Sequence, residues 1–228
     1  GEKGILSYRG YSIEELAKKS TFEETSYLLL FGELPTSSQL DEFTSKVTKY
    51  RKLPDALITI LKSLPKETKP MDVLQMAVSS LGTFYNLEVS PEMVKGKKYD
   101  RDYFMNTSAA LIGALGSVVA AWHRIRNEQE PIASNSDITY SENFLHMLGV
   151  EKITPLMTRI MDATLVLHGE HTINASTFTA MVTSSTLANA SQVVASAIGS
   201  LSGPLHGGAN EKVVSMLQKI ESKDEICH

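Results

Sequence analysis

The chain has 228 residues, which is enough for one large domain or two small ones with a substantial core. A hydrophobic fraction of 42% and a charged fraction of 21% are ordinary for a soluble globular protein, and the net charge of −4 argues against a nucleic-acid-binding protein. The single cysteine, Cys227, cannot form an internal disulfide framework and fits a reducing compartment, so we expect a cytoplasmic location.

Both ends of the chain look incomplete. It begins at Gly1 rather than at a methionine, and it stops at His228 just after a helical pattern that frays. We interpret the chain as a fragment, with any targeting sequence upstream of it.

Helix start and stop signals recur through the first part of the chain. Ser12 followed by Glu15 has the spacing of a capping box, and Gly32 with Pro35 shortly after it is typical of a helix end. Apolar residues at helical spacing follow each start. The expected helices begin near residues 12, 20, 36 and 54, and a fifth apolar segment covers residues 71–81.

Residues 86–102 have the least regular pattern, because proline, glycine and charged residues interrupt any period. They contain the basic cluster of Lys95, Lys97 and Lys98. Short runs of lysine are usually solvated surface, so we expect no nucleic-acid partner.

Two more helices are expected in the middle of the chain. Residues 108–122 carry no charge and are rich in small and aliphatic residues, which predicts a buried helix rather than a membrane span; the other helix runs from about Ser141 to Gly149. Alternating apolar and polar runs are scarce, and no Asn-Gly hairpin turn separates two of them. The sequence therefore predicts an all-α fold of about ten helices, without internal repeats or a clear domain boundary.

From His171 to Asn210 the chain has no Asp, Glu, Lys or Arg. Small residues dominate positions 175–202, which argues against a membrane span and allows helices to approach closely in a core or a subunit interface. An apolar stripe from Ala190 to Leu201 predicts a buried helix that ends at Gly203.

Two histidines follow the helix that precedes this segment. Its apolar stripe runs from Ile153 to Met161 and, continued along the same face, reaches His168 and His171. We therefore expect both rings to face the core at the helix C-terminus, where free carbonyls favour a donating imidazole. A metal site is disfavoured, because His-Gly-Glu-His matches no zincin motif and no further ligands cluster nearby. A purely structural role stays open.

His206 stands in the octet Gly-Pro-Leu-His-Gly-Gly-Ala-Asn at residues 203–210. Glycines beside a histidine indicate close access to its ring and backbone. A helix expected over 211–220 would place His206 near a helix N-terminus, whose dipole favours a neutral imidazole suited to donating to a carbonyl that gains charge. No Gly-x-Ser-x-Gly motif supports a serine nucleophile.

Taken together, these motifs resemble those of citrate synthase and the related 2-methylcitrate synthase. The matching segments follow the family order over essentially the whole chain: Tyr8–Tyr11 with Ile13, Gly32–Thr36, Pro70–Asp72, His171 with Asn174–Thr177, and Gly203–Asn210. The last two are the most specific. The resemblance implies that residues 1–228 form the N-terminal portion of a large helical domain, with the small domain and the C-terminal helices after residue 228.

The family condenses acetyl-CoA with oxaloacetate and hydrolyses the thioester to citrate and coenzyme A, a reaction of the tricarboxylic acid cycle. The resemblance makes the coenzyme A thioester a co-substrate and implies no permanently bound cofactor or metal. His206 resembles the catalytic histidine that hydrogen-bonds the thioester carbonyl as its enol forms. His171 resembles the oxaloacetate-binding histidine, and Asn174 and His168 resemble supporting residues. A homodimer is also implied, with residues 190–202 as a plausible interface.

The family also needs an aspartate base, a second catalytic histidine, arginines and a coenzyme A segment, all expected after residue 228. We therefore expect this chain alone to be inactive. Relatives often carry Arg, Asp and Arg where this chain has Met181, Asn189 and Gln75. Three alternatives stay open: a 2-methylcitrate synthase that uses propionyl-CoA, an inert relative, and a structural or binding helical module.

Overall fold

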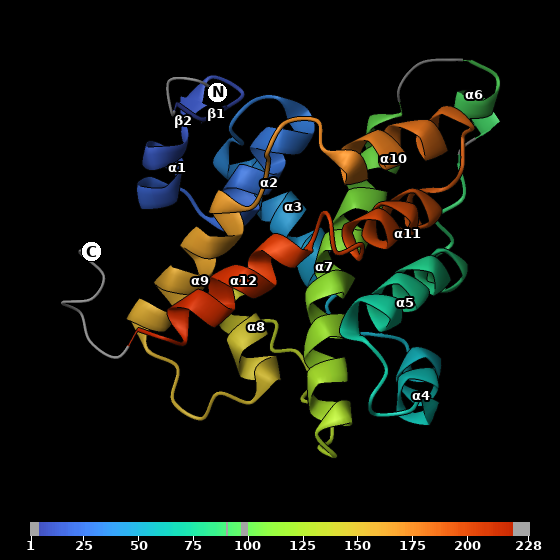
Figure 1. The fold of residues 1–228 in the computed structure, drawn as a ribbon. Helices are drawn as coiled ribbons and strands as arrows, with labels where there is room; N and C mark the ends of the chain where they lie inside the picture. Colours follow the sequence, from blue (N-terminus) through green and yellow to red (C-terminus); the bar gives the residue numbers. More distant parts are fainter. Residues whose placement is uncertain (1–4, 90, 97–99, 221–228) are drawn as a thin grey trace.

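The structure is a computed structural model that describes residues 5–89, 91–96 and 100–220, and most of the described residues lie in helices (Figure 1). The predictions that concern Gly1, Lys97, Lys98, Cys227 and His228 lie outside these residues. The all-α fold class is confirmed. The helices are α1 Ile13–Lys19, α2 Phe22–Phe31, α3 Ser37–Lys49, α4 Asp55–Ser63, α5 Pro70–Tyr85, α6 Pro91–Val94, α7 Arg101–Arg126, α8 Tyr140–Leu148, α9 Pro155–Leu167, α10 Ala175–Ser185, α11 Ala190–Leu201 and α12 Gly208–Leu217.

A short hairpin precedes the first helix. Strands β1 Ser7–Tyr8 and β2 Tyr11–Ser12 pair antiparallel. The two turn residues have positive φ, 51° at Arg9 and 93° at Gly10, as a two-residue hairpin turn with the natural strand twist requires. The sequence pattern misses this hairpin because Arg9 stands where Asn or Asp is usual.

Side-chain caps fix the starts of the early helices. Thr21 and Glu24 form a reciprocal capping box at α2. At α1, the Ser12 hydroxyl accepts from the backbone N–H of Glu14 at 3.3 Å. The capping box predicted between Ser12 and Glu15 is therefore wrong, because the cap bond is made to Glu14 and not to Glu15.

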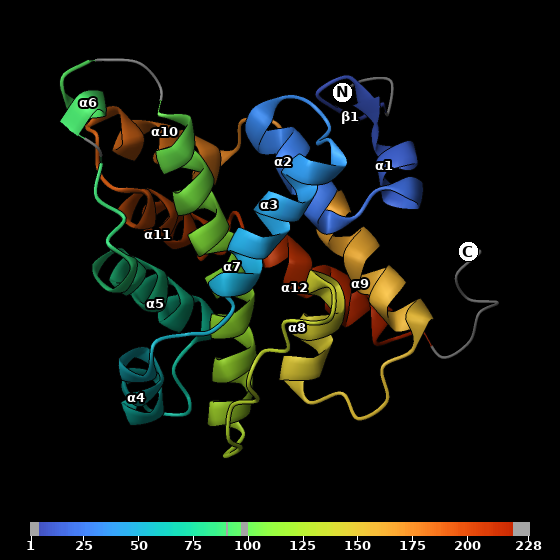
Figure 2. The same ribbon diagram turned by 180° about the vertical axis from the view of Figure 1, so that it is seen from behind.

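Helix α7 runs through the middle of the fold and packs against α3, α5 and α8 (Figures 1 and 2). Gly113 lets α3 approach, because a Cβ at this position would collide with the carbonyl oxygen of Val47. By length and composition α7 could cross a membrane, but 61% of its most apolar window is buried inside the fold, as expected for a core helix. The main core cluster joins it to α4 and α5 through residues such as Leu57, Leu81 and Trp122.

Helix α11 packs on α5 and α10. Ser191, Ala195 and Ile198 are buried there, and a Cβ on Gly82 of α5 would collide with the Ser191 hydroxyl. The small residues of α11 therefore allow close helix packing within the chain. The expected subunit interface over 190–202 stays a prediction.

The buried face of α9 is not the one that its apolar stripe predicts. Leu156 and Ile160 are 67% and 57% exposed, whereas Asp162 and Val166 are buried. The Asp162 carboxylate accepts from the Ser141 hydroxyl at 2.8 Å and from the backbone N–H of Phe22 at 3.1 Å. These bonds join α9 to α8 and α2 and turn the polar residue inward, because a buried carboxylate needs partners of this kind.

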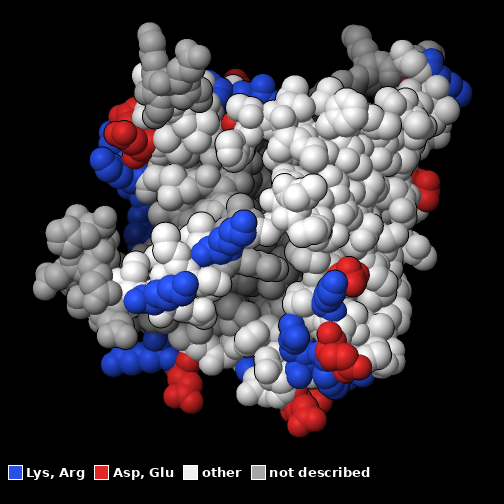
Figure 3. Space-filling model, viewed as in Figure 1, with Lys and Arg blue, Asp and Glu red and all other residues white. Residues whose placement is uncertain are grey.

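Exposed apolar side chains gather on the last four helices and the loops between them. We call this set the C-terminal apolar surface; it comprises Leu156, Ile160, Leu167, Ile173, Phe178, Met181, Val182, Leu187, Leu201, Leu205, Val213, Val214, Met216 and Leu217. Figure 3 shows a broad area without charged side chains over α10 and α11. A surface of this kind marks a region that binds another polypeptide or a ligand.

Candidate active site

His206 lies in a tight turn between α11 and α12. The backbone N–H groups of His206 and Gly207 both donate to the carbonyl oxygen of Gly203, each at 3.0 Å. A Cβ at Gly207 would collide with the carbonyl oxygen of Leu201, so only glycine fits there without a shift. Because α12 begins at Gly208, the expected position of His206 just before a helix N-terminus is confirmed.

The imidazole of His206 contacts the first turn of α10. Its Nε2 lies 2.7 Å from the Ser176 hydroxyl oxygen, and both residues are half-buried. Either atom can donate in this pair. When the hydroxyl donates, Nε2 accepts, the ring proton resides on Nδ1, and Nδ1 is free to donate to a bound molecule. With the Ser176 hydroxyl as the donor, His206 has the tautomer that a donor role requires.

Asn174 is the N-cap of α10. Its Oδ1 accepts from the backbone N–H of Thr177 at 2.9 Å and from the Thr177 hydroxyl at 3.2 Å. The cap occupies the amide oxygen, whereas the exposed amide nitrogen keeps two hydrogens that can bind an anion. Asn174 and the residue that contacts His206 therefore belong to the same helix start.

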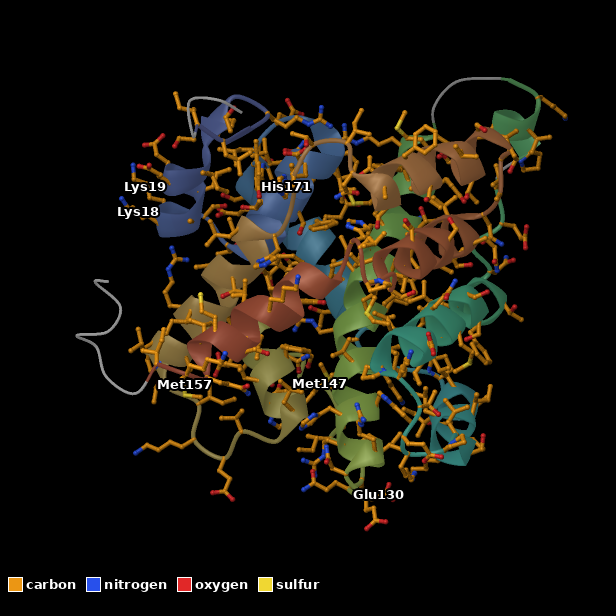
Figure 4. The ribbon with its side chains drawn as sticks, viewed as in Figure 1. Lys18, Lys19, Glu130, Met147, Met157 and His171 are labelled. Carbon is orange, nitrogen blue, oxygen red and sulfur yellow. The ribbon has the colours of Figure 1, made fainter. Side chains whose placement is uncertain are left out.

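His171 is exposed, in the loop between α9 and α10. The prediction that it continues the α9 stripe toward the core is wrong, because α9 ends at Leu167 and the following turn carries the chain away from the helix axis. Thr172 has a φ of 60°, which sharpens this turn. Figure 4 shows His171 beside the loop that connects α9 to α10.

His168 is the C-cap residue of α9 and is also exposed, so the prediction that it faces the core is wrong. Its Nδ1 lies 2.7 Å from the carbonyl oxygen of Thr164. A carbonyl only accepts, so Nδ1 carries the proton in this pair and Nε2 faces outward. The ring thus donates to a carbonyl at the helix C-terminus, as expected, but this carbonyl is not free, because it also accepts from the backbone N–H of His168 at 3.2 Å.

Tyr8 anchors the loop that carries these histidines, and sequence reasoning did not identify this role. Its buried hydroxyl lies 3.1 Å from the carbonyl oxygen of Val166 and accepts from the backbone N–H of Glu170 at 3.2 Å. Burial raises the pKa of Tyr8 above its usual value of 10.0. Tyr8 belongs to the first segment that resembles the family, which is the one sequence signal that could have pointed to it.

The residues predicted from the sequence converge on one region. His206 contacts Ser176, two residues after the N-cap Asn174, and the segment that leads into α10 carries His168 and His171. The imidazoles of His206 and His171 and the amide of Asn174 can donate hydrogen bonds to carboxylates and to a carbonyl, and the N-terminal dipole of α10 favours a negative charge. Among the described residues, no recorded contact places an aspartate beside these rings.

Comparison with known proteins shows one consistent family. The model of the family "Citrate synthase, C-terminal domain" matches residues 1–228. The citrate synthase of Synechocystis sp. is 42% identical over 226 residues, covering 99% of this chain and 55% of that protein. The 2-methylcitrate synthase of Shewanella oneidensis is 40% identical over 222 residues, covering 96% and 56%.

Solved structures agree with the sequence matches. The crystal structure of citrate synthase from Pyrobaculum aerophilum superposes with a TM-score of 0.86 at 37% identity, covering 96% of this chain and 55% of that one. The chain thus spans about half the length of the relatives it matches.

Proposed function

The chain belongs to the citrate synthase family, and from this membership we propose that the whole protein condenses acetyl-CoA with oxaloacetate and releases citrate and coenzyme A. The observation that carries the proposal is the hydrogen bond between His206 and Ser176, because it positions one imidazole at the start of α10. The proposal places residues 1–228 in the N-terminal portion of the large helical domain, with a small domain formed by other residues.

In the proposed reaction, His206 Nδ1 donates to the thioester carbonyl as the methyl group loses a proton. Negative charge then builds on the carbonyl oxygen, and a donor already positioned there stabilises the transition state by roughly 2.7 to 4 kcal/mol. The proposal assigns the donor role in the bond between these residues to the Ser176 hydroxyl, so that Nε2 accepts and the ring proton resides on Nδ1. Proton removal falls to an aspartate outside residues 1–228, so this chain alone is expected to be inactive.

Oxaloacetate carries two carboxylates and a keto group, and the groups before α10 fit such a substrate. The exposed ring of His171 and the amide of Asn174 offer donors near a helix N-terminus, where anions are stabilised, whereas the Nδ1 proton of His168 is donated to the Thr164 carbonyl. We assign His171 to the keto acid, with Asn174 and His168 in support. No bound cofactor or metal is required, and coenzyme A enters as the thioester co-substrate.

The test is thiol release from acetyl-CoA by the whole protein in the presence of oxaloacetate. His206→Ala should lower kcat by roughly 10²-fold or more, since one such donor is lost. Ser176→Ala should lower kcat less, because the ring stays in place. Ser185→Ala is the matched control, as its exposed hydroxyl bonds only to the Val182 carbonyl at the far end of α10. Wild-type activity in His206→Ala would overturn the proposal.

A 2-methylcitrate synthase is the second candidate, supported by the Shewanella oneidensis relative of that name. Propionyl-CoA has one more methylene than acetyl-CoA, and one methylene in an apolar pocket changes selectivity by roughly 10- to 200-fold. The ratio of kcat/KM for the two thioesters separates the candidates. A ratio above ten in favour of propionyl-CoA would replace the first proposal with the second.

We propose a cytoplasmic homodimer, with neither nucleic acid nor membrane as a partner. The C-terminal apolar surface supports association with a second copy, and the helix over 190–202 supplies the interface expected from the sequence. Sedimentation equilibrium of the whole protein should give a dimer mass, and a monomer at high concentration would contradict the proposal.

A further inference from the structure

Glu170 lies between the two histidines that follow α9, and its carboxylate has no part in the reaction proposed above. The side chain is half-buried, and its Oε1 accepts from the backbone N–H of Thr172 at 2.5 Å. This hydrogen bond spans one residue, His171. It therefore closes a ring that contains the His171 backbone.

The backbone of Glu170 is itself fixed to the rest of the fold. Its N–H donates to the Tyr8 hydroxyl at 3.2 Å, and the same hydroxyl lies 3.2 Å from the Glu170 carbonyl oxygen. Gly169, just before it, packs closely on α2, because a Cβ at this position would lie 3.1 Å from the Leu29 side chain. The Glu170 carboxylate thus extends from a well-held point of the chain.

Little else holds the three residues that follow. His171, Thr172 and Ile173 are all exposed, and the His171 ring makes no hydrogen bond within the described chain. Among the described residues, the bond from Thr172 to Glu170 is the one hydrogen bond that positions 171–173 make. The next fixed point is Asn174, the N-cap of α10. The orientation of the His171 ring therefore depends on the backbone that Glu170 closes.

Thr172 has a conformation that its side chain disfavours. Its φ is 60°, and it is the one β-branched residue with a positive φ in the part of the chain that the structure describes. Such a conformation costs free energy and persists only where surrounding contacts impose it; residues of this kind cluster at binding sites. The bond from the Glu170 carboxylate is a contact that can impose it here.

The charge of Glu170 does not explain its place beside a histidine assigned to oxaloacetate. Oxaloacetate carries two carboxylates, and a further negative charge near them repels the substrate. The acceptor oxygen, rather than the charge, is therefore the favourable contribution of this side chain.

We propose that Glu170 is a positioning residue, whose carboxylate oxygen holds Thr172 in the left-handed conformation and thereby orients the His171 ring for the keto acid. The inference rests on the proposed function, because it takes His171 as the residue that binds oxaloacetate. Glu170 acts through the loop and does not itself contact the substrate.

The test measures kcat and both KM values of the whole protein by thiol release. Glu170→Ala should raise the KM for oxaloacetate by roughly tenfold, with kcat and the KM for acetyl-CoA within about twofold of wild type, because only one substrate loses a well-placed donor. Glu170→Gln keeps an acceptor oxygen at the same chain length and removes the charge, so its KM for oxaloacetate should be at or below the wild-type value. Glu67→Ala, at an exposed carboxylate between α4 and α5, is the matched control and should change nothing.

Three kinetic results would overturn the proposal. An unchanged KM for oxaloacetate in Glu170→Ala would mean that the loop does not need the bond. An equal rise in Glu170→Gln and Glu170→Ala would mean that the charge acts, for instance by keeping the His171 ring protonated. A rise in both KM values together would mean a general loss of structure.

A second readout does not depend on the reaction. In protein with ¹³C-labelled histidines, NMR relaxation of the His171 ring signal, assigned with His171→Gln, should show a more mobile ring in Glu170→Ala than in wild type and Glu170→Gln. If the wild type releases no thiol, the proposed function fails, and this comparison still decides whether Glu170 holds the ring. Equal mobility in all three proteins would overturn the inference whatever the activity.

Discussion

The helices around α7 and the helices from α9 to α12 differ in how fully their apolar side chains are buried. Around α7, apolar faces find partners on α3, α4, α5 and α8, and leucines such as Leu57, Leu61 and Leu81 are fully buried. From α9 onward, large apolar side chains such as Leu156 and Phe178 are exposed, yet this segment carries the candidate site. The site is therefore held less by a core than by a few local contacts.

Those local contacts are specific and few. The Tyr8 hydroxyl holds the loop after α9, Gly207 permits the turn at His206, and Asn174 caps α10. Each acts on one or two backbone groups, so its loss should disturb the site more than the whole fold. The contrast with the α7 core can be tested by variants that act on one region at a time.

The largest effect is expected in the core. Leu57→Ala should lower the free energy of unfolding by roughly 2 to 5 kcal/mol, because Leu57 is fully buried and its removal leaves a cavity. The same change at Leu156, which is 67% exposed, should cost less than about 0.5 kcal/mol. Urea denaturation of both variants measures the difference, and equal losses would mean that the two regions are equally packed.

Gly207→Ala should cost about 1 to 3 kcal/mol, because the added Cβ forces the turn at His206 away from the carbonyl oxygen of Leu201. Gly208→Ala is the matched control, since a Cβ there meets nothing within 4 Å. Chemical shifts of the His206 ring should move in the first variant alone. If both variants behave alike, close packing of the turn is not what holds the imidazole.

Tyr8→Phe should cost about 1 to 2 kcal/mol, since it removes the acceptor of the Glu170 N–H and one of the two donors to the Val166 carbonyl, which also accepts from the Gly169 N–H. Hydrogen exchange at Glu170 should quicken more than exchange in α7, with Tyr11→Phe, at an exposed ring, as control. Burial raises the pKa of Tyr8, so its contribution is complete below pH 10 and is lost as the pH rises through the higher folded-state pKa. A pH-independent difference between wild type and Tyr8→Phe would contradict this role.

The sequence predicts the helices around α7 and their buried faces better than those from α9 to α12, for a physical reason. Helix periodicity and caps report local preferences, and in the α7 region the tertiary contacts agree with them: the helix expected over 71–81 is α5, and the uncharged segment 108–122 lies within α7. In α9 the buried Asp162 makes hydrogen bonds that periodicity does not register, and they decide which face turns inward.

The candidate site likewise contains residues whose positions the sequence predicts and residues whose positions it does not predict. His206 was placed correctly beside a helix N-terminus because glycines and a helix start are local signals. The exposure of His171 and the anchoring by Tyr8 depend on contacts between residues about 160 positions apart, which one sequence cannot reveal. The bond between Ser176 and His206 joins residues 30 positions apart, so local sequence patterns do not reveal it.

The smallest effect on stability is expected on the C-terminal apolar surface. Ile160→Gln replaces a side chain that is 57% exposed, so unfolding of the monomer should change by less than about 0.5 kcal/mol. If a second copy covers α9, the same variant should weaken association, and the denaturation midpoint of the wild type alone should rise with protein concentration. Denaturation at two protein concentrations shows whether the α9 face is exposed in a monomer or covered by a second copy. Ile60→Gln, on the exposed side of α4, is the control. A large loss for Ile160→Gln that does not depend on concentration would show that α9 is packed within its own chain, and the difference between the two regions would then disappear.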